Sequence, residues 1–321
     1  MTNLMSFKLP KDLGSKVIKS VLIPFVAFLL FLAIWGGVAS QIETSLGKVP
    51  GPTKVWEQTM VLIDEHNAER DKEVKFIQRQ EDRNAKKLEK NPQAEVKIRP
   101  YTGQPTFVDQ MFTSLYTVLT GFIVASLIAI PIGIVSGLSN TVHQAINPLI
   151  QIFKPVSPLA WLPIVTMIVS AVYVSDDPMF SKSFLNSAIT VTLCCMWPTI
   201  INTAIGVSSI DQDLINVSRV LRLNWVTKIY KIVLPSSVPM IFAGLRLSLG
   251  IGWMVLIAAE MLAQNPGLGK FVWDEFQNGS SDSLARIMVA VFAIGLIGFM
   301  LDRSMLYFQR KVSWDRNAII R

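Results

Sequence analysis

The sequence predicts an all-α polytopic membrane protein with about six transmembrane helices. Of its 321 residues, 51% are hydrophobic and only 17% are charged, a balance that is unusual for a soluble globular domain. The apolar residues also gather into long runs, and roughly 20 consecutive apolar residues let a helix cross a hydrocarbon core about 30 Å thick. Composition and run length together indicate a chain that crosses the membrane several times.

Six runs are candidate membrane spans: residues 21–39, 112–137, 145–174, 184–207, 238–263 and 284–308. The third run is interrupted by Pro155, Pro158 and Pro163. Because proline removes a helical hydrogen bond and clashes with the preceding turn, we expect a broken or kinked helix there. Residues 112–308 then form the main membrane core, preceded by a separate first span.

Lysine and arginine cluster before the first span, between the fourth and fifth, and after the sixth. An even number of crossings places all three clusters on one side of the membrane, and basic segments beside spans stay in the cytoplasm. We therefore expect the N-terminal tail (1–20), the connection 209–234 and the C-terminal tail (309–321) to be cytoplasmic. The net charge of +7 follows from this topology signal, so nucleic-acid binding is not expected.

The connection from residue 40 to residue 111 is long and charged. Between Glu57 and Arg99 acidic and basic residues nearly balance, and helix-favouring residues dominate up to Asn91 and Pro92. This pattern predicts an extracytoplasmic helical excursion. Two roles fit it, a solvated spacer or a docking element for an extracytoplasmic partner.

Small residues recur every fourth position in two of the runs. The stripes are Ala125, Ala129, Gly133 and Gly137 in the second run, and Gly244, Ser248 and Gly252 in the fifth. Such stripes allow close helix approach in lipid. We expect the first stripe to pack within the chain, whereas the second fits packing within the chain or against a second chain.

Ionisable side chains inside membrane segments are costly, so the few present are candidates for function. The predicted solute pathway consists of Lys154, Trp161, Arg246 and Glu260. If the solute is an anion, Lys154 or Arg246 would attract it and Glu260 would repel it. The alternatives are snorkelling or pairing with a neighbouring helix for the charged residues, and core packing or an interfacial position for Trp161.

The connection between the fourth and fifth spans is amphipathic. Ser209 and Gln212 have the spacing of a capping box, which predicts a helix start. Apolar residues then recur on one helical face, at Ile210, Leu214, Val217 and Leu221.

A second short helix is expected after a break at Asn224, ending at Leu234-Pro235. Both helices are too polar to span a membrane. They either lie at the lipid headgroups or insert into a groove of a cytoplasmic protein.

Several function classes are disfavoured by what the sequence lacks. It contains no G-x-x-x-x-G-K-[ST] phosphate loop, so an ATP-hydrolysing site is not expected in this chain. His66 and His143 are far apart, and the adjacent Cys194 and Cys195 suit neither a disulfide framework nor a metal site. We expect no enzymatic activity, no cofactor and no metal here.

Residues 215–239 resemble the cytoplasmic coupling loop of binding-protein-dependent ABC importer permeases. The family signature is E-A-A, three residues, G, and about ten residues later I-x-L-P. The corresponding residues are Asn216-Val217-Ser218, Arg222 and Ile232-Val233-Leu234-Pro235. Asn216 and Arg222 thus replace the usual Glu and Gly, while N-V-[SA]-R-V-L resembles the nitrate-type branch. Further similar segments are VPGPTKV, SLYTVLTGFIVASLIAIPIGIVSG, KPVSPLAWLPIV, FAGLRLSLGIGWMVLIAAEML and GLG.

The resemblance implies a type I ABC importer permease fold in a bacterial inner membrane, with both termini cytoplasmic. The implied solute is a small oxyanion, nitrate or nitrite first, with bicarbonate, cyanate or a sulfonate such as taurine as alternatives. The implied partners are a second permease copy, two cytoplasmic ATPase subunits that bind ATP and Mg, and an extracytoplasmic solute-binding protein. The implied coupling residues are Leu214, Asn216, Val217, Arg219, Val220, Leu221, Arg222 and Leu223. A secondary transporter or channel is the remaining class, although the sequence shows no internal repeat of the kind common there.

Overall fold

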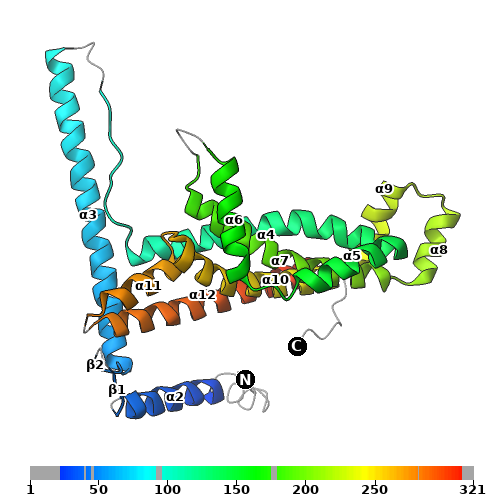
Figure 1. Ribbon diagram of the computed structural model, residues 1–321, viewed down its shortest axis with the longest axis horizontal. Helices are drawn as coiled ribbons and strands as arrows, with labels where there is room; N and C mark the ends of the chain where they lie inside the picture. The colour runs from blue at the N-terminus through cyan, green and yellow to red at the C-terminus, as the bar shows by residue number, and fades with distance from the viewer. Residues whose placement is uncertain are drawn as a thin grey trace, which may run out of the picture.

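The computed structural model describes residues 22–39, 41–44, 47–91, 96–174, 179–280 and 282–312. Its regular secondary structure is helical apart from one short hairpin (Figure 1). The predicted N-terminal tail 1–20 and residues 313–321 of the predicted C-terminal tail 309–321 lie outside these residues. The helices are α2 (Ile23–Ala39), α3 (Pro52–Lys90), α4 (Phe107–Leu138), α5 (Asn140–Phe153), α6 (Pro158–Val172), α7 (Lys182–Ser208), α8 (Gln212–Val220), α9 (Trp225–Lys228), α10 (Leu234–Ala263), α11 (Leu268–Asn278) and α12 (Ser283–Val312). A π-helical turn, η2 (Ile229–Val233), joins α9 to α10, and β1 (Glu43–Thr44) pairs antiparallel with β2 (Gly47–Lys48).

Within the described residues, four helical segments are long and apolar enough to cross a membrane. They are α4, α7, the continuous run Trp225–Ala263, and α12. Helices α5 and α6 form a fifth span when counted as one broken pair, and α2 is a shorter apolar helix of 17 residues. These six elements match the six predicted runs and confirm the all-α polytopic fold class.

The third span is broken, as its prolines predict. Helices α5 and α6 meet at an angle of 101°. Helix α5 ends at Phe153, and its capping residue Lys154 directly precedes Pro155. Ser157 caps the start of α6 by accepting a hydrogen bond from the Leu159 N–H at 3.3 Å. A proline after one helix and a capped proline at the first position of the next both favour this break.

Helix α7 lies between α4 and α10 and is the most enclosed of the apolar segments long enough to span by themselves (Figure 1). Its residues Val191 and Cys195 are fully buried in a cluster with Val118 of α4 and Leu256 of α10. Lipid tails are as apolar as these side chains, so close packing rather than burial from water holds such helices together. The three helices therefore need small residues at their contacts.

The first small-residue stripe supplies the contact between α4 and α7. A Cβ atom added at Gly133 would lie 2.6 Å from the Thr203 Cβ and 2.9 Å from the Ile200 carbonyl oxygen, and one at Gly137 would lie 2.5 Å from the Val207 Cβ. Real Cβ atoms essentially never come so close to another heavy atom. The first stripe packs within the chain, as predicted.

The second stripe packs on the other side of α7. The Ser248 hydroxyl donates to the Cys195 carbonyl at 2.6 Å and lies 2.7 Å from the Thr199 hydroxyl. Gly244 faces Asn202, and a Cβ atom at Gly252 would collide with the Cys195 Sγ. The sequence left open what this stripe contacts, and in the structure it packs within the chain against α7.

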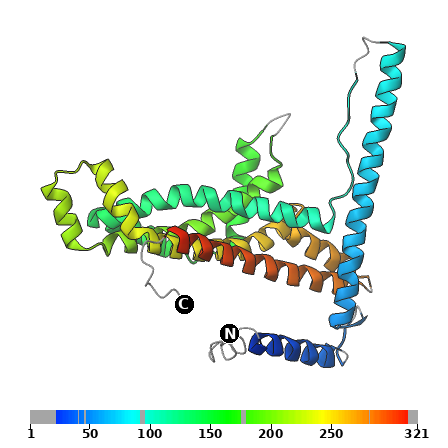
Figure 2. The same cartoon turned by 180° about the vertical axis from the view of Figure 1, so that it is seen from behind.

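Helix α3 crosses one end of the bundle almost at right angles and extends well past it (Figures 1 and 2). At its base, Val55 and Leu62 pack with Phe271 of α11 and Val289 of α12. Ion pairs add to this contact, because Arg286 of α12 bonds to Glu65 of α3 and Lys54 lies 2.9 Å from Asp282. Helices α8 and α9 lie at the opposite end of the bundle.

The chain returns from the tip of α3 along the helix itself. Gln80 and Arg99 exchange two hydrogen bonds of 3.0 and 2.9 Å. The Tyr101 hydroxyl donates to Glu69 at 2.6 Å and thereby holds the pKa of that carboxyl below its usual value. The ring of Phe76 packs edge-on against Tyr101. Helix α3 and the return segment 96–106 together form an arm, which is two-layered from residue 66 onward.

Gly133→Ala should destabilise the protein, because the added methyl group meets backbone and a β-branched side chain that cannot move aside. We expect the free energy of unfolding to fall by about 1–3 kcal/mol, seen as an earlier thermal unfolding transition in detergent. Gly295→Ala is the matched control, since nothing lies within 4 Å of its Cβ position. There the helix propensity of alanine should leave stability unchanged or raise it by up to about 1 kcal/mol. Equal shifts in the two variants would contradict this packing argument.

Candidate functional site

The amphipathic segment predicted between the fourth and fifth spans forms a compact projection at the end of the bundle, made of α8, α9 and η2 (Figure 1). Asp211 starts α8, and its side chain accepts a hydrogen bond from the Asp213 N–H at 2.9 Å. The predicted capping box at Ser209 is therefore wrong. The Ser209 hydroxyl instead donates to the Gly206 carbonyl at the end of α7, because the buried side chain of Ile210 anchors the chain to the bundle before α8 begins.

One face of α8 rests on the bundle. Ile215 packs on a cluster formed by Ile134, Val207 and Val233, and Ser218 is 3% exposed. The Ser218 hydroxyl is satisfied locally, donating to the Ile215 carbonyl at 2.6 Å. This contact holds α8 at a fixed position relative to α4, α7 and η2.

Three of the four residues of the predicted apolar stripe face away from the chain, and the fourth, Ile210, is buried. Leu214, Val217 and Leu221 are 44%, 51% and 63% exposed, and Val220 beside them is 82% exposed. Trp225 of α9 and Tyr230 of η2 are exposed as well, at 62% and 68%. Asn216 and Arg219 lie at the edge of the apolar face of α8, joined by a hydrogen bond of 3.3 Å. A contiguous exposed apolar patch rimmed by polar residues marks an interaction site.

Arg222 and Leu223 close α8 in a Schellman motif. The Arg222 N–H donates to the Arg219 carbonyl and the Leu223 N–H to the Ser218 carbonyl, both at 3.0 Å. This geometry requires the left-handed conformation at Arg222, whose φ is 49°. Left-handed backbone costs a non-glycine residue roughly 1–2 kcal/mol, so the site is held under local strain.

Asn224 ends the turn, as predicted, and caps α9 by accepting a hydrogen bond from the Thr227 N–H at 2.7 Å. The predicted helix end at Leu234-Pro235 is wrong, since the chain stays helical from Trp225 to Ala263. In the π-helical turn η2 the Leu234 N–H donates a hydrogen bond to the Ile229 carbonyl. Pro235 then occupies the first turn of α10, where a missing N–H is tolerated. The projection is thus continuous with the fifth span.

Lys154 and Trp161 lie at the elbow between α5 and α6. Lys154 is exposed at the end of α5. The Trp161 ring lies 5.7 Å from Phe153, which stacks on Trp197 of α7 at 6.0 Å. The indole N–H groups of Trp161 and Trp197 are buried and have no hydrogen-bond partner among the described residues.

Arg246 of α10 and Asp302 of α12 form a bidentate ion pair. The Arg246 Nε donates to one carboxylate oxygen at 2.5 Å and Nη2 donates to the other at 3.0 Å. Both side chains are about one-third exposed and border a cavity of about 200 Å³ that Gly250 and Trp253 also line. Pairing with a neighbouring helix was one of the two predicted alternatives for Arg246, and it ties α10 to α12.

Glu260 is fully buried and joins three helices. Its carboxylate accepts hydrogen bonds from the Ser114 hydroxyl of α4 at 2.8 and 2.9 Å and from the Gly269 N–H of α11 at 2.9 Å. Ser114 in turn accepts the Leu268 N–H at 2.8 Å. The carboxylate so fills the space beside Gly267 that a Cβ atom there would collide with it. The G-L-G sequence is therefore the binding surface for Glu260 at the start of α11.

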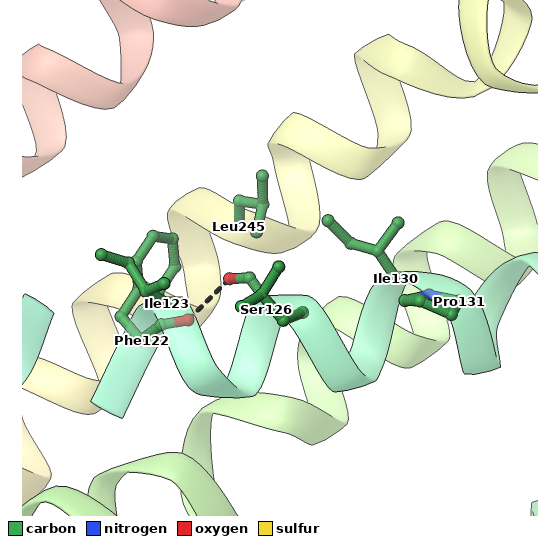
Figure 3. A pocket seen from close by; sticks show the side chains of 7 residues that line it. Phe122, Ile123, Ser126, Ile130, Pro131 and Leu245 are labelled. Carbon is green, nitrogen blue, oxygen red and sulfur yellow. Dashed lines mark hydrogen bonds between the residues drawn. The ribbon is translucent and has the colours of Figure 1, made fainter. Parts of the chain in front are cut away.

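A pocket of about 340 Å³ opens along α4 beside Leu245 of α10 (Figure 3). Its lining is apolar except for Ser126, whose hydroxyl donates back to the Phe122 carbonyl at 2.7 Å. Nothing in this lining would recognise an anion, and its residues suit lipid or another apolar helix.

Sequence reasoning missed three residues that complete these contacts: Ser114, Trp197 and Asp302. Asp302 carried a usable signal, since an acidic residue inside an apolar run calls for a basic partner. Ser114 and Trp197 carried none, because serine and tryptophan are ordinary in membrane helices. In the described parts of the chain, no group of three or more His, Cys, Asp or Glu residues could hold a metal ion.

The sequence profile of a transporter family, described as "Binding-protein-dependent transport system inner membrane component", matches residues 129–314. The chain belongs to this family. The matched region runs from the second half of α4 through α12 and includes α8, whereas α2 and α3 lie outside it. Members of this family are membrane components of transporters, and the recognition of an ABC importer permease is confirmed.

Two curated relatives carry transport names. The nitrate import permease protein NrtB of Synechococcus elongatus is 36% identical over 223 residues, which is 67% of this chain and 76% of that protein. The bicarbonate transport system permease protein CmpB of the same organism is 36% identical over 202 residues, which is 63% of this chain and 68% of that protein.

A solved structure supports the fold. The inward-facing MetNI methionine ABC transporter matches with a TM-score of 0.55 at 12% identity, over 64% of this chain and 95% of that chain. Identity this low speaks for the fold alone, which is the type I permease fold predicted from the sequence.

The strained position in α8 explains one residue of the permease signature. The signature has glycine where this chain has Arg222, and the structure places that position in the left-handed conformation that glycine adopts without cost. In this permease the helix end is kept by its hydrogen bonds despite the arginine.

Arg222→Gly should stabilise the end of α8 by about 1 kcal/mol, since it removes the left-handed strain. Hydrogen exchange of the α8 amides should slow roughly fivefold. Arg219→Gly, one turn earlier in right-handed helix, should have the opposite sign and speed exchange, because glycine costs about 1 kcal/mol inside a helix. Faster exchange in Arg222→Gly would contradict the assigned role of this position.

Proposed function

We propose that this chain is the permease subunit of an ATP-driven importer for a small oxyanion, nitrate first. The observation that carries the proposal is the exposed apolar face of α8, formed by Leu214, Val217, Val220 and Leu221. It is held rigidly at one end of the bundle, in a chain whose family works with partner proteins. An apolar helix face of this size fits a groove on a partner.

The partner at α8 is a cytoplasmic ATPase subunit, and two such subunits bind ATP and Mg for a permease dimer. Closure of the ATPase pair displaces α8, and η2 passes the displacement into α10 because the helix is unbroken from Trp225 to Ala263. The polar rim of the contact consists of Asn216, Arg219 and Arg222, and Leu223 borders it at the end of the turn. The proposal includes a cytoplasmic location for α8 and both termini and an extracytoplasmic location for α3.

The choice of nitrate follows from the relatives. The nitrate permease matches a larger share of this chain than the bicarbonate permease, 67% against 63%, at the same identity. Nitrate and bicarbonate are both planar monovalent anions with three oxygens, so one pathway chemistry suits either. The chain chemistry agrees, because residues 110–175 contain Lys154 as their single Lys or Arg and no Asp or Glu.

The four residues of the predicted pathway divide into two pairs. The first pair, Lys154 and Trp161, interacts with the solute, and the second pair, Arg246 and Glu260, holds helices together. Lys154 is exposed and attracts the anion, and the Trp161 indole N–H offers a donor near it. Arg246 is committed to Asp302, and Glu260 to Ser114 and Gly269. The two paired residues therefore set the distances between α10 and its neighbours.

Reconstitution tests the proposed function. The permease, its ATPase subunits and its solute-binding protein are placed in proteoliposomes, and uptake of labelled nitrate is measured with and without ATP. We expect uptake only with ATP and with nitrate-loaded binding protein. Bicarbonate, cyanate and taurine are compared in the same assay. If the permease without its partners takes up nitrate in the absence of ATP, it is a secondary transporter. If the complete system transports bicarbonate and not nitrate, bicarbonate replaces nitrate as the proposed solute.

Leu221→Asp should detach the ATPase, because burying an unpaired carboxylate of the apolar face of α8 in the partner's groove has a large free-energy cost. ATPase co-purification should fall at least tenfold while membrane insertion stays normal. Gln212→Asp is the matched control, since it adds the same charge to the same helix about half a turn away around the helix axis. Undiminished ATPase binding by Leu221→Asp would remove α8 from the coupling mechanism.

A further inference from the structure

Helix α3 carries an exposed apolar stripe along its whole length. Its large hydrophobic residues with more than a third of their surface exposed are Trp56 (66%), Met60 (39%), Ile63 (43%), Val74 (53%) and Leu88 (39%). At about 100° per residue, all five fall within an arc of about 80° on one side of the helix. From the first to the last the stripe is about 48 Å long at 1.5 Å per residue.

The stripe is separate from the side of α3 that already makes contacts within the chain. Val55 and Leu62 point at the bundle, and Glu69 and Gln80 bind the return segment. These residues share one side of the helix, and the stripe is turned about a third of a turn from it. The stripe therefore lies on a different side of α3 from the residues that contact the bundle.

Charge along the arm is divided between its base and its tip. Residues 57–82 contain eight acidic and four basic residues, whereas residues 83–99 contain six basic and two acidic residues. A partner lying along the stripe would be fixed in direction by this reversal of sign, because like charges in the wrong orientation repel.

We propose that the α3 stripe is the docking surface for the extracytoplasmic solute-binding protein of this importer. The inference rests on the proposed function, which places α3 outside the membrane, at the end opposite the α8 coupling face. The partner is a soluble protein with an apolar ridge between a basic patch, facing the base of the arm, and an acidic patch, facing its tip.

Lipid is the poorer occupant of this face. Asn67, Gln78 and Glu81 share the stripe with the apolar residues at the same angular position, whereas a helix lying in a bilayer surface has a continuous apolar side. A sparse apolar row among polar residues is instead ordinary for a non-obligate protein interface.

Ion pairs connect the arm to other helices of the chain, so that a protein bound to the arm acts on those helices. Its base is tied to α12 through Glu65 and Arg286, and Arg286 also lies 3.3 Å from Glu275 of α11. Helix α3 is also tied to the start of α4 by the ion pair between Arg70 and Asp109 at 3.1 Å. Force on the stripe therefore reaches three helices of the membrane core.

Site-specific photocrosslinking tests the docking surface directly. A photoreactive amino acid replaces Val74 or, as the matched control, Ala68, which is exposed and lies about a third of a turn away from the stripe. The whole transporter in membranes is irradiated with purified nitrate-loaded binding protein. We expect an adduct with the binding protein at Val74 and little at Ala68. An adduct with a second copy of this chain, or with lipid alone, would overturn the proposal.

A functional readout uses Val74→Glu and Ala68→Glu in the reconstituted transporter. Val74→Glu should raise the binding-protein concentration for half-maximal ATPase stimulation about tenfold and leave basal hydrolysis unchanged, whereas Ala68→Glu should alter neither. Equal stimulation curves would overturn the proposal. The proposed function fails separately, through absence of ATPase binding or of ATP-dependent nitrate uptake in the native chain, and the crosslink at Val74 does not depend on which anion is carried.

Discussion

The enclosure of α7 between α4 and α10 is the constraint on which the other elements depend. Gly133 and Gly137 of α4 bring its backbone against α7, and Ser248 of α10 bonds to the α7 backbone from the other side. Since the small residues of α4 and α10 are used on this inner side, large ones such as Leu127 and Met254 remain outside. The outer surfaces of both helices are thereby left for lipid or for a second permease copy.

Polar contacts then fix the helices that α7 does not touch closely. Glu260 binds Ser114 and the start of α11, and Arg246 binds Asp302. In a membrane such groups have no water to bond to, so each must find its partner inside the protein. These two contacts hold α11 and α12 to the core, and through Arg286 they hold the base of α3 as well.

The helix bundle therefore has an exposed apolar surface at each end. At one end the apolar residues of α8 project from the bundle, and at the other the α3 stripe lies across it. Neither surface is covered within the described chain, and both are connected to the same membrane helices, α8 through η2 and α3 through α12. The proposed transmission of motion between an outer and an inner partner requires this kind of architecture.

Run length, proline positions and small-residue spacing determined the membrane fold class, the broken third span and the stripe at Gly133, because each depends on local backbone geometry and on the thickness of lipid. The exposed face at Leu221 followed from helical period in the same way. Only the tertiary structure decided that Glu260 and Arg246 are paired, that the second short helix runs on into α10, and that α3 lies across the bundle. The two pairings and the position of α3 depend on residues distant in sequence, such as Ser114 and Arg286, and a local pattern does not show which distant residue each side chain meets.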